Sequence, residues 1–182
     1  MLGIIGLRDE IKEDAKETIK RLKQIGKRVI MLSGDNENTA NLIAKELKID
    51  EVYSNVSPDE KLYKIKEINK NGNVLMVGDG INDSPALKAA TIGVSVSNGT
   101  DISSDAASII LINDSMGKIV ELFNIGKKTM TIIRQNLFWA LFYNMCMIPL
   151  ATGLLPISIN PMIASLAMTI SSLTVVLNSL RI

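Results

Sequence analysis

The chain has 182 residues and a formal net charge of +1, so its overall charge indicates neither a nucleic-acid surface nor a strongly acidic partner. It contains no histidine, which excludes histidine-based catalysis and histidine metal ligands. Its single cysteine, Cys146, excludes an internal disulfide and is typical of a reducing compartment. We predict no signal peptide, because the apolar run 1–7 is short, lacks a basic leader and continues directly into charged residues.

Residues 1–134 alternate between short apolar runs and amphipathic segments with helical spacing. Strands that alternate with helices in this way predict an α/β fold whose parallel sheet is covered by helices on both faces. Gly26 follows the first predicted helix and is expected to end it as the C′ residue. In chain order, we predict strands at Gly3–Leu7, Val29–Leu32, Val52–Ser54, Val74–Val77, Ile92–Val96 and Ser108–Ile112, with helices near Glu13–Ile25, Asn38–Leu47, Glu60–Asn69, Ser84–Ala89 and Met116–Arg134.

Charged residues almost disappear from the last quarter of the chain, where only Arg181 lies beyond Arg134. Two apolar runs in this quarter, 137–155 and 162–180, each have the roughly 20 residues that a helix needs to cross a bilayer. The uncharged stretch 153–161 between them is rich in turn residues. These features predict a two-helix transmembrane hairpin, with a buried hairpin in a soluble core as the alternative.

Basic residues flank the two apolar runs at their outer ends. Lys127, Lys128 and Arg134 precede the first run and Arg181 follows the second, which places both outer ends in the cytoplasm by the positive-inside bias. Residues 119–136 are expected to form a continuous helical linker into the membrane, since their apolar residues keep a helical face and contain no proline. The α/β part is therefore expected to be cytoplasmic.

A glycine-rich acidic loop follows the predicted strand Val74–Val77 and reads Gly-Asp-Gly-Ile-Asn-Asp from Gly78 to Asp83. Its glycines let the backbone turn sharply, and Asp79 stands at the carboxyl end of a strand, where open α/β sheets bind ligands. Magnesium prefers such carboxylate oxygens, usually together with a substrate phosphate. The loop therefore predicts an Mg²⁺ site beside a phosphate; the alternative is a tight turn capped by Asn82 or Asp83.

Two further loops follow predicted strands. The hydroxyl of Ser33, with the backbone N–H groups of Gly34 and Asp35, could hold a phosphoryl oxygen ahead of a helix. Lys61 could neutralise phosphate as a compact positive charge. Ordinary structural alternatives remain for each loop: Asp35 or Asn36 as a helix N-cap in the first, and a solvated lysine on a helix capped by Ser57 in the second.

The order of these three loops resembles the phosphorylation domain of P-type ATPases, a haloacid-dehalogenase-like fold. The resemblance continues through Asn98–Asp101 and Ile133–Ala140 into the apolar region, and within the superfamily it is similar to the heavy-metal transporting branch. It implies that Ser33 hydrogen-bonds the phosphoryl group, that Lys61 neutralises it and that Asp79 ligates Mg²⁺. It also implies that the polar network around this cofactor site is completed by Asn82 and Asp83.

The phosphorylated aspartate of that family, in the string Asp-Lys-Thr-Gly-Thr, does not occur in this sequence. Asp9 is the candidate after the first predicted strand, but it lacks the threonine and glycine residues that should follow. An aspartyl-phosphate mechanism cannot proceed without its nucleophile. We therefore expect a carboxyl-terminal fragment of a pump that is inactive alone and whose partner is the missing amino-terminal portion, which would also be needed for ATP use.

The expected domains of this fragment are a partial phosphorylation domain at 1–118, the linker 119–136 and the membrane hairpin 137–182.

The apolar region also carries a candidate cargo site. Met168, Ser171 and Ser172 share one helical face, and Tyr143 and Asn144 place polar groups in the other apolar run. A thioether is a soft ligand that suits Cu(I). The Tyr-Asn pair and the Met-x-x-Ser-Ser motif resemble the pattern of the Cu(I) pumps. This resemblance implies Cu⁺ as the transported ion. The alternative is that these residues pack between membrane helices.

The resulting hypothesis is part of an ATP-driven Cu(I)-exporting P-type ATPase, integral to a bacterial-type plasma membrane and in contact with the lipid bilayer. Two alternatives come from other classes of protein. One is a membrane-anchored phosphatase of the same fold, which would need an aspartate nucleophile. The other is a non-catalytic interaction module that docks on a full-length pump.

Overall fold

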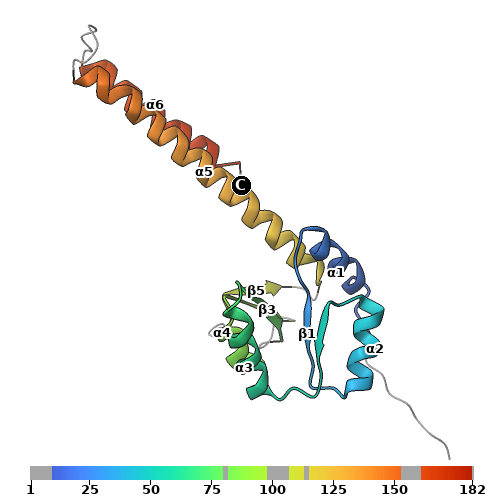
Figure 1. Cartoon of the computed structure of the whole chain (residues 1–182). Coiled ribbons are helices and arrows are strands. Elements are labelled where there is room, and N and C mark those ends of the chain that lie inside the picture. The colour runs from blue at the N-terminus through green and yellow to red at the C-terminus, as the bar shows by residue number, and fades with distance from the viewer. Residues whose placement is uncertain (1–9, 80–81, 98–106, 113–114, 153–160, 182) are drawn as a thin grey trace, which may run out of the picture. The chain divides into compact units, whose positions relative to one another are not determined.

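The computed structural model describes residues 10–79, 82–97, 107–112, 115–152 and 161–181 (Figure 1). The chain divides into two compact units, Met1–Val120 and Glu121–Ile182. The helices are α1 (Ala15–Gln24), α2 (Glu37–Leu47), α3 (Pro58–Asn69), α4 (Ser84–Ala89), α5 (Gly117–Ala151) and α6 (Pro161–Ser179). The strands are β1 (Ile30–Leu32), β2 (Glu51–Tyr53), β3 (Leu75–Gly78), β4 (Ile92–Ser97) and β5 (Ile109–Ile112).

The strands of the first unit pair in parallel, which confirms the predicted α/β fold class, but they form two sheets instead of the single sheet predicted. One sheet pairs β1 with β2, and the other has the order β3-β4-β5. Within the described residues, β1 and β3 each pair with one neighbour and keep the other edge open. The predicted strand Gly3–Leu7 lies outside the described residues.

Helix ends in the first unit follow their sequence signals. Gly26 has φ +76°, and the N–H of Lys27 donates to the Leu22 carbonyl at 3.0 Å, so α1 ends in a Schellman-type cap as predicted from Gly26. A capping box begins α3: the Ser57 hydroxyl accepts from the Glu60 N–H at 3.3 Å, and the Glu60 carboxylate accepts from the Ser57 N–H at 2.8 Å. This cap fixes the first turn of α3, which carries Lys61.

Two apolar clusters hold the first unit together. One is centred on buried side chains of α3, β3 and α4, and it also packs against Leu32 of β1. The other joins α1 and α2 and includes Met116, just before α5. Their buried members are Ile65, Met76, Ala86 and Leu87 in the first cluster, and Ala15, Ile19 and Leu47 in the second.

Asp14 connects the start of α1 to the start of α5. Its carboxylate accepts from the Ser115 hydroxyl at 2.8 Å and from the Gly117 N–H at 3.1 Å. These contacts, led by the Ser115 hydroxyl, hold the pKa of Asp14 below the ordinary value of 3.8. The carboxylate is thus a specific link between segments about 100 residues apart in the chain.

The second unit consists of most of α5 together with α6. Side-chain hydrogen bonds join the two helices: Asn136 donates to the Ser179 hydroxyl at 2.8 Å, and Asn178 donates to the Asn136 amide oxygen at 2.8 Å. The expected spans 137–155 and 162–180 overlap α5 and α6, and the connection 153–160 lies outside the described residues.

In the part of the chain that the structure describes, we find no helix with the length and apolar character needed to cross a membrane.

Replacing Asp14 by Asn should lower the free energy of unfolding of the α/β unit by about 1.5–3 kcal/mol, the usual worth of a hydrogen bond to a charged group. Because the folded pKa is depressed, the stabilisation is present above the ordinary value of 3.8 and is lost as pH falls through the folded pKa. The difference between wild-type and Asp14→Asn urea midpoints should therefore be steady near neutrality and shrink below about pH 4.

Glu13→Gln is the matched control, since it removes a neighbouring exposed carboxylate. A midpoint shift for Asp14→Asn no larger than that of Glu13→Gln would contradict the assigned link.

Candidate phosphate and metal site

Lys61 and Asp83 form an ion pair at the carboxyl end of β3. The Lys61 ammonium lies 2.8 Å from the Asp83 carboxylate, and the two side chains are 18% and 15% exposed. Lys61 comes from the first turn of α3, whereas Asp83 is the N-cap residue of α4. The contact therefore brings two of the predicted site residues together from loops 22 residues apart in sequence.

Asp83 takes this position because Gly78 has no side chain. A Cβ at Gly78 would lie 2.8 Å from the Asp83 carboxylate oxygen and 3.0 Å from its Cβ, closer than real Cβ contacts allow. The Asp83 side chain makes no capping hydrogen bond to α4. The alternative of a simple side-chain cap by Asp83 is thus wrong, because the carboxylate turns toward Lys61 instead.

Asp79 directly follows β3 and is exposed, as is Asn82. The Asp79 backbone carbonyl accepts a hydrogen bond from the hydroxyl of the buried Ser95 of β4 at 3.5 Å. Among the described residues there is no group of three or more acidic, cysteine or histidine side chains that could enclose a metal ion. A magnesium ion here would therefore depend on one or two carboxylates with water and substrate oxygens, which is its usual mode of binding.

The loop after β1 orients the Ser33 hydroxyl through Asp35. The hydroxyl donates to the Asp35 carboxylate at 2.7 Å and accepts from the Asp35 N–H at 3.1 Å. The N-cap of α2 is Asn36, which accepts from the Thr39 N–H at 3.0 Å. Asp35 thus holds the serine, and the neighbouring asparagine caps the helix.

Backbone hydrogen bonds fix this loop against the end of β2. The Ser33 N–H donates to the Tyr53 carbonyl at 2.9 Å, and the Val56 N–H donates to the Ser33 carbonyl at 3.0 Å. Gly34 directly follows the anchored Ser33. A Cβ added at Gly34 would lie 3.7 Å from the Val56 carbonyl oxygen, which is an ordinary contact distance. Gly34 is exposed, beside Ser33.

The two halves of the predicted site share an apolar core. Leu32, directly before Ser33, packs against the cluster that contains Met76 of β3. Sequence reasoning missed two contributors, Gly78 as the residue that makes room for Asp83 and Ser95 as a donor to the Asp79 backbone. The glycine was visible in the sequence, whereas the contact of Ser95 depends on strand pairing that the sequence alone does not specify.

The predicted cargo residues lie on α5 and α6. Tyr143 packs against the rings of Trp139 and Phe142, each with a centroid distance of 6.3 Å. Met168 is 68% exposed, and the Ser172 hydroxyl donates to the Met168 carbonyl at 3.1 Å. Ser172 thus makes the backbone hydrogen bond expected of serine in a packed helix.

The hydrogen bond between Asn136 and Ser179 defines the antiparallel register of the two helices. Both helices rise by about 1.5 Å per residue. A residue seven positions after Asn136 in α5 is therefore level with the residue seven positions before Ser179 in α6. Tyr143 and Asn144 therefore lie level with Ser172, about two turns from the hydrogen-bonded end.

The chain belongs to the haloacid dehalogenase-like hydrolase family, because the model of that family matches residues 1–91. The parallel strands with acidic and glycine-rich loops at their carboxyl ends agree with this membership.

Three known proteins are similar to nearly all of the chain. The probable copper-exporting P-type ATPase of Archaeoglobus fulgidus is 42% identical over 182 residues, covering 98% of this chain and 23% of that protein. The copper-exporting P-type ATPase of Staphylococcus aureus strain JH9 is 44% identical over 184 residues, covering 100% and 22% respectively. The crystal structure of a zinc-transporting PIB-type ATPase in its E2.Pi state superposes with a TM-score of 0.86 at 32% identity, covering 96% of this chain and 28% of the other.

The chain thus spans about a quarter of the length of these relatives. The similarity confirms the resemblance to heavy-metal P-type ATPases that the loop order indicated.

Replacing Gly78 by Ala should destabilise the α/β unit by about 1–3 kcal/mol, because the new Cβ would overlap the Asp83 side chain. Gly72→Ala is the matched control, since a Cβ there meets nothing within 4 Å. Urea unfolding of both variants measures the difference.

The Asp83→Gly background tests the cause, because it removes the overlapping atoms. Gly78→Ala should cost less in that background than in wild type. An equal cost in the two backgrounds would show that the close approach of Asp83 is not the reason for the glycine.

Proposed function

We propose that this chain supplies the Mg²⁺- and phosphate-binding half of the phosphorylation domain, and part of the intramembrane metal site, of an ATP-driven Cu(I)-exporting P-type ATPase. The observation that carries the proposal is the half-buried Lys61–Asp83 ion pair beside the Gly78–Asp79 turn. The pair puts a cation against the Asp83 carboxylate at the end of the parallel strand that Asp79 directly follows, where phosphate and magnesium would be bound together.

Each site residue has a distinct task in this proposal. Asp79 would hold Mg²⁺, which when bound neutralises charge on the phosphoryl oxygens. Lys61, kept in place by Asp83, would stabilise the same group as a fixed positive charge. Ser33, oriented by Asp35, would donate its hydroxyl proton in a hydrogen bond to a phosphoryl oxygen.

The open strand edges suggest how the rest of the domain would join. β1 and β3 each end a sheet, and both are followed by site loops. A strand supplied by the preceding portion of the pump could pair with both edges and place its own aspartate between Ser33 and Asp79.

The membrane part of the proposal rests on the apolar runs 137–155 and 162–180 and on the large apolar side chains that α5 and α6 expose. Bilayer contact would cover these side chains, with the α/β unit in the cytoplasm of a bacterial-type plasma membrane.

Cu(I) is favoured over a harder ion as the cargo. Tyr143, Asn144, Met168 and Ser172 would form part of its site, and no acidic or histidine side chain occurs between Gln135 and Ile182. The two copper-exporting relatives share 42% and 44% sequence identity with this chain, whereas the matched crystal structure of a zinc transporter shares 32%.

In a chimera that joins this chain to the amino-terminal portion of a relative, Asp79→Ala should lower Mg²⁺-dependent phosphoenzyme formation from labelled ATP by at least about 100-fold. The reason is the loss of the carboxylate that holds the ion. Lys61→Ala should be similarly severe, whereas Asp59→Ala, which removes an exposed carboxylate of α3, serves as the control.

The 182-residue chain alone should incorporate no label, because it lacks the nucleophile. Near-normal labelling of the Asp79→Ala chimera would show that the loop is only a turn. Labelling of the chain alone would instead favour a phosphatase of the same fold.

In the same chimera, Met168→Leu should reduce Cu(I)-stimulated ATP hydrolysis by at least about tenfold, since even outer-shell partners of a metal are worth this much. The substitution nearly preserves side-chain volume and removes the sulfur. Met162→Leu is the control, because Met162 is another exposed methionine of α6 and lies outside the proposed site. If both variants keep wild-type stimulation, Met168 has a packing role and the cargo assignment fails.

A further inference from the structure

The turn between β2 and α3 holds the Ser33 loop through backbone hydrogen bonds. The Asn55 N–H donates to the Asp35 carbonyl at 2.8 Å, and the Val56 N–H donates to the Ser33 carbonyl at 3.0 Å. The Ser33 N–H in turn donates to the Tyr53 carbonyl at 2.9 Å. The loop that would bind a phosphoryl group is therefore held at its first residue and at its last.

Asn55 has φ +54°, in the left-handed region that residues with a side chain rarely adopt. Asparagine is one of the residues that tolerate this conformation best. Successive N–H groups of an extended strand point to opposite sides. Because the chain leaves the extended conformation at Asn55, its own N–H and that of Val56 can both donate to the Ser33 loop.

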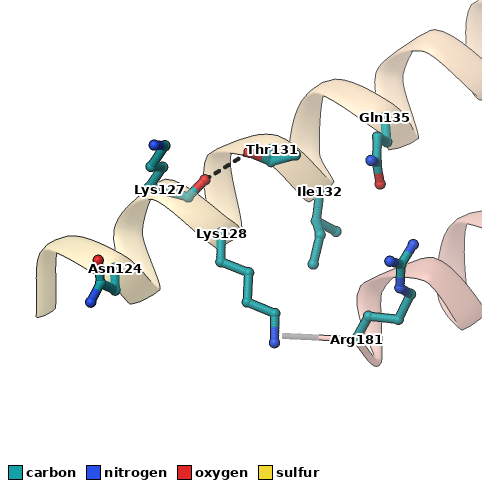
Figure 2. A pocket seen from close by; sticks show the side chains of 7 residues that line it. All are labelled: Asn124, Lys127, Lys128, Thr131, Ile132, Gln135 and Arg181. Atoms are coloured by element: carbon teal, nitrogen blue, oxygen red, sulfur yellow. Dashed lines mark hydrogen bonds between the residues drawn. The ribbon is translucent and has the colours of Figure 1, made fainter. Parts of the chain in front are cut away.

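The pocket of the second unit is built differently. Its volume is about 320 Å³, and residues of α5 line it together with Arg181, just beyond α6 (Figure 2). The hydrogen bond drawn in Figure 2, from the Thr131 hydroxyl to the Lys127 carbonyl at 2.9 Å, stays within α5. The bonds of the Asn55 turn instead join segments that are distant in sequence, so they can fix one site loop relative to another.

The same turn leads directly into the helix that carries Lys61. Val56 is buried, and Ser57 begins α3 with a capping box. The Lys61 N–H donates to the Ser57 carbonyl at 2.9 Å, so the first turn of α3 is fixed to this cap. The placement of the Ser33 hydroxyl relative to the Lys61 ammonium group therefore depends on the backbone at Asn55.

We propose that Asn55 is a positioning residue for phosphoryl binding. Its left-handed backbone sets the Ser33 loop against the start of α3, so that the Ser33 hydroxyl and the Lys61 ammonium group reach the same phosphoryl group. The Asn55 side chain is exposed, so the role belongs to the backbone conformation, which glycine would also supply. This role rests on the proposed phosphate function of Ser33 and Lys61.

Inhibition of the chimera by orthovanadate, a phosphate analogue, measures this positioning. Asn55→Val should raise the vanadate concentration for half-inhibition by about 5- to 30-fold, the factor that corresponds to the usual cost of a left-handed backbone for a residue with a Cβ. Asn55→Gly should stay near wild type, because glycine adopts this conformation without steric cost. If Asn55→Val does not fold, Asn55→Ala provides the same comparison, since alanine has a Cβ but no branch.

Lys48 provides a matched control. It is exposed, has φ +56° and lies at the opposite end of α2 from the Ser33 loop. Lys48→Val should lower the urea midpoint as Asn55→Val does, but leave vanadate inhibition unchanged. An equal rise in both valine variants would show general destabilisation and overturn the positioning role. An equal rise in Asn55→Gly and Asn55→Val would overturn it as well, because the side chain would then be responsible.

Hydrogen exchange of the full 182-residue chain tests the same role without ATP. The protection factor of the Val56 amide should fall at least about fivefold in Asn55→Val and stay near the wild-type value in Asn55→Gly and Lys48→Val. Unchanged protection in Asn55→Val would show that the left-handed backbone does not hold the turn on the Ser33 loop.

Ser33→Ala and Lys61→Ala in the chimera separate the proposed function from the role of Asn55. If neither weakens vanadate inhibition, the proposed phosphate function fails. If either weakens it while Asn55→Val does not, the phosphate site stands and the positioning role of Asn55 fails.

Discussion

The ion pair between Lys61 and Asp83 is the contact on which the candidate site depends. Both side chains are less than one fifth exposed, so removing either one would leave a partly desolvated charge without its partner. The pair also fixes the direction in which the loop after β3 leaves the sheet, since the Asp83 carboxylate must pass over Gly78. The lack of a side chain at Gly78 therefore determines where the Lys61 ammonium group lies.

The charges of this site explain why phosphate and magnesium would bind together. Asp79, Asp83 and Lys61 have a combined formal charge of −1, which alone would repel a phosphate group. A divalent cation held by Asp79 would reverse that sign, because a bound metal ion is often the largest charge in its surroundings. On the proposed function, the lysine and the metal would therefore act on opposite sides of the same phosphoryl group, and Asp83 would keep the lysine from turning into solvent.

Local features of this fold were predictable from sequence, whereas contacts between distant segments were not. The glycine end of α1 and the Ser57 cap of α3 depend on a few consecutive residues: the first was predicted from Gly26, and the second was named as the structural alternative for its loop, without the reciprocal Glu60 contact. The Lys61–Asp83 pair and the link from Asp14 to Ser115 join residues 22 and 101 positions apart, and they depend on how whole elements pack. The division into two sheets is also non-local, because alternating strands and helices predict parallel pairing but not which strand edges stay open.

The second unit depends on the side-chain hydrogen bonds at one end of the α5–α6 pair, as the candidate site of the first unit depends on the Lys61–Asp83 ion pair. Helices surrounded by lipid gain little from apolar burial against each other, so hydrogen bonds such as those of Asn136 and Asn178 would contribute to their association. These bonds also set the register that brings Tyr143 level with Ser172, about 10 Å from the hydrogen-bonded end. Ser172 already donates to the Met168 carbonyl, which leaves its oxygen lone pairs free to accept or ligate. On the proposed function, a soft ion would be held chiefly by the Met168 thioether, with the oxygen atoms of Tyr143 and Ser172 adjusting its position. The hydrogen bonds of Asn136 and Asn178 at one end of the pair would then control the geometry of a metal site about two helical turns away.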